Sequence, residues 1–243
     1  SLHELEYWCT DAVEKESTHY IELDKVDSEP PVITKEMFGL WLGECPPEDG
    51  GDKCYVSDNG DSGVKVSVED PNPEHAVNQV ECKWGYNFDG QFFGWYYPES
   101  LTWEVIFEQD STHELIIECQ DALGNSIRDE EEFLVDSTPP VTTKTYGLPF
   151  FEEDDYHWIS STTPVTLSAK DEKVGVDKTY WRNTLLTEVS DENCVATCEY
   201  RGTGDFVEYT GPFTKPEESC HLIEFYSVDK LGNTEEINSQ CVF

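Results

Sequence analysis

The chain has 243 residues, and 52 acidic against 15 basic side chains give it a formal net charge of −37. This charge repels polyanions, so it excludes proteins that bind nucleic acid by neutralising phosphates or that dock on anionic membranes. Hydrophobic residues still make up 37% of the chain and aromatic residues 13%, which is too much apolar content for a disordered acidic protein. No stretch reaches the roughly 20 apolar residues that a membrane-spanning helix needs, and we expect no membrane insertion in this segment.

The opening residues 1–29 contain a strand, a turn and a second strand that recur later in the chain. The strand from His3 to Asp11 returns at residues 113–121 and again at 221–229, at intervals of 110 and 108 residues. The pair Pro30-Pro31 returns 109 residues later as Pro139-Pro140. A repeat of about 109 residues is too long for a solenoid unit and suits an independent β-sandwich.

Strand signals within the two full repeats agree with this reading. Val64–Glu69 and Val165–Lys170 alternate apolar and polar residues, and each is followed by an aspartate, Asp70 or Asp171. An Asp-x-x-Gly-Asn turn at 121–125 and again at 229–233 closes a hairpin. No window shows a capped 3.6-residue apolar stripe, so helix should be minor.

The predicted fold class is therefore all-β, with tandem immunoglobulin-like antiparallel β-sandwiches. Residues 1–29 form a terminal hairpin of another module, and residues 30–138 and 139–243 each form a whole module. The Pro-Pro pairs at the boundaries make the connections short and stiff.

The nine cysteines include no CxxC pair and no zinc-ligand spacing, so we interpret them as disulfides formed in an extracellular, oxidising environment. Cys45 and Cys54 flank a Gly/Pro-rich insertion at 45–54 and are expected to staple it. Other pairings, such as Cys198 with Cys220, stay open. The expected remaining pairs are Cys82–Cys119, Cys220–Cys241 and Cys194–Cys198.

Cys9 is the odd cysteine, and it occupies the position of Cys119 in the earlier copy. Its partner would lie upstream of Ser1, outside this chain. Either the chain is cut from a longer array, or the hairpin is donated to a module of a neighbouring subunit, because a lone hairpin is marginal in water.

A strand with His-x-Leu/Ile, then Asp-x-x-Gly-Asn, then Val-Asp-x-x-Pro-Pro resembles the immunoglobulin-like, fibronectin-III-like repeats of large archaeal and bacterial cell-surface proteins. The segment Tyr209-Thr-Gly-Pro-Phe213 is similar to the Tyr-x-Gly-Pro-Phe turn of these repeats. The module at 30–138 departs from the pattern, since it lacks that turn. The resemblance implies stalks, surface layers, adhesins or extracellular filaments, and it supplies no catalytic residues.

Catalytic and metal motifs are scarce. There is no Gly-x-Ser-x-Gly elbow, no His-Glu-x-x-His and no phosphate-binding glycine loop, and we predict no enzyme and no required cofactor. Calcium is the one ion considered. Asp58 and Asp61 superficially resemble a calcium loop, although an ordinary strand-entry turn explains them better. Acidic residues near the module junction, namely Asp70, Asp121, Asp136 and Glu152 to Asp155, could also hold a hard cation.

An aromatic run at 86–97 has no counterpart in the second module. Its rings either fill the core alternately or, where exposed, bind glycan or another subunit. The run comprises Tyr86, Phe88, Phe92, Phe93, Trp95, Tyr96 and Tyr97.

These observations predict a structural or assembly segment of an extracellular cell-surface, surface-layer or filament protein. Its partners would be neighbouring modules or copies, joined through the N-terminal hairpin. The alternative is an adhesin-type module that recognises glycan or protein through the run at 86–97.

Overall fold

A computed structural model describes residues 2–47, 53–71, 79–153, 156–187, 202–215 and 219–242. These residues form antiparallel β-strands and no helix, which confirms the all-β prediction. In the described part of the chain there is accordingly no helix long and apolar enough to cross a membrane. The chain divides into two compact units, Ser1–Val135 and Asp136–Phe243. The division falls three residues before the boundary predicted from the Pro-Pro pair, and each unit is described separately below.

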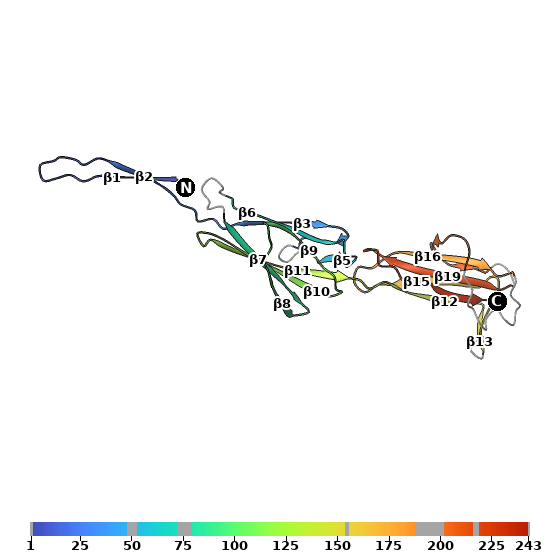
Figure 1. Cartoon of the computed structure of the whole chain (residues 1–243). Coiled ribbons are helices and arrows are strands. Elements are labelled where there is room, and N and C mark those ends of the chain that lie inside the picture. The colour runs from blue at the N-terminus through green and yellow to red at the C-terminus, as the bar shows by residue number, and fades with distance from the viewer. Residues whose placement is uncertain are drawn as a thin grey trace. The chain divides into compact units, whose positions relative to one another are not determined.

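The N-terminal hairpin consists of β1 (Leu2–Tyr7) and β2 (Tyr20–Lys25), drawn at the blue end of the ribbon in Figure 1. The two strands form a sheet of their own, with Leu2 opposite Lys25 and Tyr7 opposite Tyr20. All twelve strand residues are exposed to solvent, in contrast to the strands of the two sandwiches.

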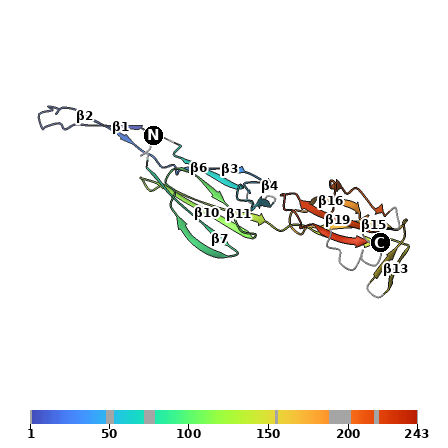
Figure 2. The ribbon, with the colours of Figure 1, turned by 45° about the vertical axis from the view of Figure 1, so that its right-hand side comes forward.

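The first module is a sandwich of a three-stranded and a six-stranded sheet, seen as two layers in Figure 2. The smaller sheet has the order β3 (Val32–Phe38), β6 (Gly63–Glu69), β9 (Thr102–Ile106). The larger sheet has the order β4 (Trp41–Leu42), β5 (Cys54–Ser57), β11 (Ser126–Asp136), β10 (Thr112–Asp121), β7 (Val80–Phe88), β8 (Gln91–Tyr96).

The core of this module follows from alternation along its strands. Val64, Val66 and Val68 on β6 face Leu115 and Ile117 on β10, and all five side chains are buried. Side chains two apart on a strand share a face, so the alternating pattern read from the sequence does define the buried layer. The disulfides Cys45–Cys54 and Cys82–Cys119 are both present, the second between directly opposed residues of β7 and β10.

The second module has a sheet of β12 (Val141–Tyr146), β15 (Pro164–Lys170) and β18 (Phe213–Thr214). Its other sheet has the order β17 (Val207–Glu208), β16 (Val176–Leu185), β19 (His221–Asp229), β20 (Asn238–Val242). A separate hairpin, β13 (Phe150–Glu153) with β14 (Tyr156–Ile159), completes it.

Two buried clusters hold the second module together. Leu167, Ile223 and Phe225 belong to one cluster, and Cys220, Leu222 and Cys241 to the other. Cys220 and Cys241 are each disulfide-bonded, but their mutual pairing stays a prediction. The predicted pair Cys194–Cys198, the middle of the insertion at 45–54, and Asp154 and Asp155 lie outside the described residues.

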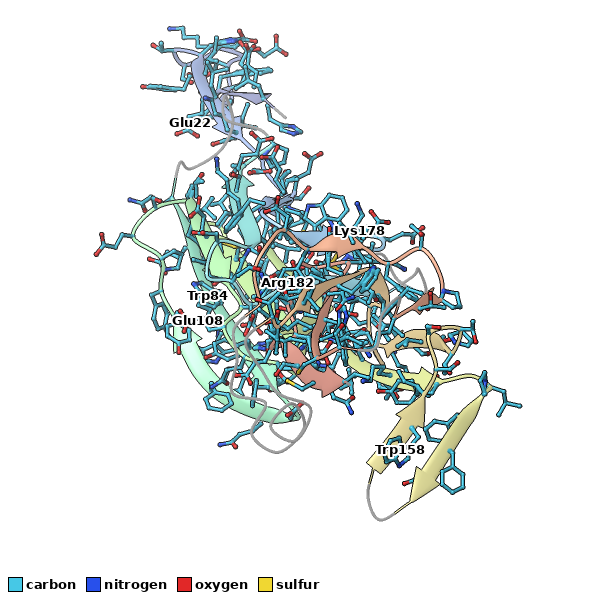
Figure 3. The ribbon with its side chains drawn as sticks, turned by 90° about the vertical axis from the view of Figure 1, so that its right-hand side faces the viewer. Glu22, Trp84, Glu108, Trp158, Lys178 and Arg182 are labelled. Carbon is cyan, nitrogen blue, oxygen red and sulfur yellow. A yellow bond between two sulfur atoms is a disulfide. The ribbon has the colours of Figure 1, made fainter. Side chains whose placement is uncertain are left out.

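Arg182 on β16 and Glu224 on β19 form a bidentate ion pair. Arg182 donates from Nε to Oε2 at 2.6 Å and from Nη2 to Oε1 at 3.0 Å. Both side chains are largely buried, and Arg182 is labelled in Figure 3. The paired geometry satisfies a carboxylate that the sheet removes from water.

Candidate functional site

Three aspartates converge in each module. In every trio, one carboxylate oxygen of each residue lies within 4.8 Å of the others. The trios are Asp27, Asp70 and Asp121 in the first module and Asp136, Asp171 and Asp229 in the second.

Strand register brings these residues together. Val32 at the start of β3 is opposite Glu69 at the end of β6. The residues that precede β3 therefore lie beside Asp70, which follows β6. Asp121 is the last residue of β10, in the facing sheet. The second module repeats the arrangement, with Val141 opposite Lys170 and Asp229 ending β19.

The third aspartate of each trio organises the hairpin turn that follows it. Oδ1 of Asp121 accepts hydrogen bonds from the backbone nitrogens of Leu123 (2.9 Å) and Asn125 (2.8 Å), and Oδ2 accepts one from Asn125 Nδ2 (2.8 Å). In the second module, Asp229 Oδ1 accepts hydrogen bonds from the backbone nitrogens of Leu231 (2.8 Å) and Asn233 (2.9 Å), and Asp229 Oδ2 accepts one from Asn233 Nδ2 (2.7 Å). Burial acts to raise the pKa of Asp121, but the hydrogen bonds from Asn125, Leu123 and Gly124 outweigh it and lower the pKa.

The turn asparagine also fixes the first aspartate of the trio. Asn125 Nδ2 donates to the backbone carbonyl of Asp27 at 3.5 Å, and Asn233 Nδ2 donates to that of Asp136 at 3.0 Å. One amide group therefore ties the chain entering the module to the turn between its last two strands. This explains why the Asp-x-x-Gly-Asn and Val-Asp-x-x-Pro-Pro motifs occur together.

Asp136 is the most constrained member of its trio, with 0% of its surface exposed. Its Oδ1 accepts a hydrogen bond from Thr138 N at 3.0 Å and lies 3.6 Å from Lys173 Nζ. Its Oδ2 is buried and accepts no hydrogen bond in the described structure. Burial is the main reason that the pKa of Asp136 is raised, and the charges of Asp171 and Asp229 raise it further.

The first module repeats this arrangement. Asp27 Oδ1 accepts a hydrogen bond from the backbone nitrogen of Glu29 at 3.1 Å, just as Asp136 Oδ1 accepts one from the residue two positions after it. Asp27 Oδ2 is buried and receives no hydrogen bond from a described residue. Buried polar atoms are nearly always satisfied, so an unsatisfied carboxylate oxygen on a residue that belongs to a cluster of three carboxylates needs an explanation. A hard cation, which takes oxygen ligands only, supplies one.

Only some of the residues proposed from the sequence as metal ligands belong to these trios. Asp70 and Asp136 do join carboxylate clusters, but in different modules. Asp58 and Asp61 join neither trio. Their loop is a turn in which Asn59 Oδ1 accepts from Asp61 N (3.0 Å) and Ser62 Oγ (2.8 Å). The prediction missed Asp27, Asp171 and Asp229, although the repeat itself placed an aspartate at each of these positions.

The aromatic run divides between the two faces of the β7–β8 hairpin. Tyr86 is opposite Leu115, so it shares the inner face, and Trp84, labelled in Figure 3, packs on the core. Phe93 stacks on Tyr86 with ring centroids 5.6 Å apart, and Tyr96 stacks on Trp84 at 4.7 Å. Because β8 is the edge of a six-stranded sheet that faces only three strands, the rings of Phe93 and Tyr96 stay half exposed.

On the outer face, Lys83 Nζ lies 4.2 Å from the centroid of the Trp95 ring, and Phe92 contacts the same ring edge-on. Tyr97, just after β8, is largely exposed. The run therefore neither fills the core completely nor lies wholly on the surface. Phe88 packs edge-on against Phe93 and contacts the buried His113.

The sequence reading also missed an exposed aromatic pair in the second module. Phe151 and Trp158 are opposite one another on β13 and β14, and both are exposed. Figure 3 shows Trp158 on this two-stranded arm. The five aromatic residues from Tyr146 to Trp158 were the available signal.

The recurring histidines have structural partners. His113 is buried, and its Nε2 lies 2.9 Å from the carbonyl of Gln109. His221 is buried too, with Nδ1 2.9 Å from Asn183 Oδ1 and Nε2 2.9 Å from Ser219 Oγ. Burial lowers the pKa of His113, and the ring is held among Tyr86, Phe88 and Phe107.

No protein-family profile and no curated protein matches the chain. Among solved structures, the chain is similar to the fibronectin(III)-like modules of Clostridium thermocellum CbhA, with 12% identity and a TM-score of 0.34 over 86% of this chain and 93% of that one. The β-sandwich of each unit is defined by its own strand order and register.

Proposed function

We propose that this chain is a structural segment of an extracellular surface-layer or filament protein, and that each module is locked by one bound hard divalent cation, with Ca²⁺ the best candidate. The observation that carries the proposal is the repeated aspartate trio with the buried, unsatisfied Oδ2 of Asp136. A cation there would join the entry to the module, the end of one sheet strand and the last hairpin turn.

The chemistry of the trios favours calcium over other metals. Every side-chain donor is a carboxylate oxygen, and no described histidine or cysteine belongs to either trio. Such oxygen-only sites suit Ca²⁺, which accepts six to eight ligands in flexible geometry, whereas Mg²⁺ requires a strict octahedron. Cations would also relieve part of the self-repulsion of a chain with a net charge of −37.

Other features support a structural role. Two disulfides cross-link the first module, and Cys220 and Cys241 are disulfide-bonded in the second. The bonds agree with an oxidising environment outside the cytosol. The polar residues that the sequence repeats, His113, His221 and the turn asparagines, are used to hold strands and turns in place.

The test is direct imaging of the chain in its native material. We expect the modules as links of a continuous assembly, with density for a cation at each trio. Isolation as a free monomer that turns over a substrate would overturn the proposal.

A second candidate is a binding module that recognises glycan or protein through the β7–β8 aromatics. Phe92, Phe93, Tyr96 and Tyr97 are exposed on one edge of the first module, which favours this reading. Loss of glycan binding by a soluble monomer on Trp95→Ala, with Trp158→Ala as the control, would support it. Glycan binding that is the same in the native chain and in Trp95→Ala, or that is absent from both, would exclude Trp95 from such a role.

A further inference from the structure

We propose that the β1–β2 hairpin is the last hairpin of a third immunoglobulin-like sandwich, whose remaining strands lie outside residues 1–243. The proposal extends the structural role argued above but does not depend on cation binding. The partner is therefore a sandwich of this same type that lacks its own final two strands.

The exposed face of the hairpin matches positions that are buried in both modules. Leu5 corresponds in the repeat to Leu115 and Ile223, and its exposure is 51%, against 0% and 1%. Tyr7 corresponds to Ile117 and Phe225, and its exposure is 45%, against 0% and 6%. A side chain that packs a core in two copies and meets water in the third lacks a covering sheet.

The turn of the hairpin has the same construction as the other two. Asp11 Oδ1 accepts from the backbone nitrogens of Val13 (2.9 Å) and Lys15 (3.0 Å), as Asp121 and Asp229 do in their turns. The backbone bonds also match, since Glu14 N donates to the Asp11 carbonyl where Gly124 and Gly232 do so in the modules. The hairpin thus has the detailed structure of the final hairpin of a module, not only its sequence.

The missing neighbour is defined by the pairing in the two modules. β10 is flanked by β11 and β7, and β19 by β20 and β16. β1 is flanked by β2, and none of the described strands takes the place of β7 or β16. The partner must therefore supply a long antiparallel strand beside β1 and a facing sheet over Leu5 and Tyr7.

Neither module of a second copy can be this partner without losing its own hairpin. β10–β11 and β19–β20 already occupy the position that β1–β2 would need. The acceptor is thus a separate module, supplied either by polypeptide joined to the start of this chain or by another subunit.

Cys9 gives the proposal a chemical marker. It corresponds to Cys119, which is bonded to Cys82 directly across the β10–β7 pair. Cys9 is exposed and free in the described chain. In the completed sandwich its thiol and one on the acceptor strand would form a disulfide, with both protons and two electrons passing to a disulfide oxidant that becomes two thiols.

The first experiment maps disulfides in the native material by peptide mass spectrometry without reduction. We expect Cys9 bonded to a cysteine from a β7-like strand. A peptide encoded upstream in the same chain identifies a continuous array, and one from a separate polypeptide identifies donation between subunits. Cys9 recovered as a free or small-molecule-capped thiol, beside intact Cys45–Cys54 and Cys82–Cys119 controls, would overturn the assignment.

The second experiment compares two substitutions on opposite faces of the hairpin in the full-length protein. Leu5→Asp should reduce incorporation into the native assembly at least tenfold. Leu23→Asp should leave incorporation into the assembly unchanged, because Leu23 is opposite Glu4 on the other face of the hairpin and corresponds to the exposed Glu132. Equal incorporation of both variants would refute the proposal. Calcium binding by the two complete modules should be the same in both variants, so a failure here is separate from a failure of the cation sites.

Discussion

Replacing Asp136 by asparagine should have opposite effects on the second module with and without calcium. In the cation-free state the trio places three carboxylates with ligand atoms within 4.8 Å of one another. At an effective dielectric constant of about 20, each ionised pair at that distance is unfavourable by about 3.5 kcal/mol. Asp136 takes part in two of the three pairs, and its Oδ2 is also buried without a hydrogen bond. Asp136→Asn should therefore stabilise the cation-free module, by an amount that the lost attraction between Asp136 and Lys173 reduces, since Asn Oδ1 can still accept the hydrogen bond from Thr138 N.

With calcium bound, the native second module should instead be more stable than the Asp136→Asn variant. A ligand at about 100 times its Kd stabilises the folded state by about 2.7 kcal/mol. For a module of about 100 residues this corresponds to a rise in Tm of about 10–20 °C. The native sequence should show that rise in its second-module transition, and Asp136→Asn should show little of it.

The assay is differential scanning calorimetry of the whole chain in EGTA and in millimolar Ca²⁺. Asp205→Asn is the matched control, because Asp205 is an exposed aspartate of the same module outside the trio. A loss of stability in Asp136→Asn that is equal in EGTA and in calcium would contradict a cation at this trio, since it would mark Asp136 as a turn residue only.

Three further results are expected. Asn233→Ala should weaken calcium binding to the second module about tenfold in isothermal titration calorimetry, because Asn233 ties the carbonyl of Asp136 to the turn; unchanged affinity would contradict this. Arg182→Leu should destabilise the second module by about 3 kcal/mol in urea unfolding, because it leaves Glu224 buried without its ion pair, whereas Lys170→Leu at an exposed pair should change stability by less than about 0.5 kcal/mol. Acidification should release calcium. The raised pKa of Asp136 means that the cation-free folded module binds protons more readily than the unfolded chain. The free energy of unfolding of the cation-free module should therefore rise as the pH falls from above that pKa towards 3.8, while the stabilisation by calcium disappears. Calcium affinity that is independent of pH between 7 and 4 would contradict the site.

The fold could be predicted from the sequence because its signals are local. Val64–Glu69 and Val165–Lys170 alternate cleanly, and the repeated Asp-x-x-Gly-Asn turns mark the same hairpin twice. The pairing of Cys82 with Cys119 followed from their neighbours on the same face.

The trios were harder to predict because their members are distant in sequence. Asp27 meets Asp70 only when β3 pairs with β6, and Asp121 comes from the facing sheet. The loop at Asp58 and Asp61 resembled a calcium loop because its acids are close in sequence, but it forms the ordinary turn that the sequence favoured there. The β13–β14 arm was missed because it interrupts the repeat.

The binding of one cation by each aspartate trio is best tested by a crystal structure of the chain grown in calcium, with anomalous diffraction data. We expect one anomalous peak inside each trio. An oxygen of each of Asp136, Asp171 and Asp229, and likewise of Asp27, Asp70 and Asp121, should lie about 2.3–2.6 Å from its peak. Water or the Lys173 ammonium in place of that peak, at saturating calcium, would contradict it.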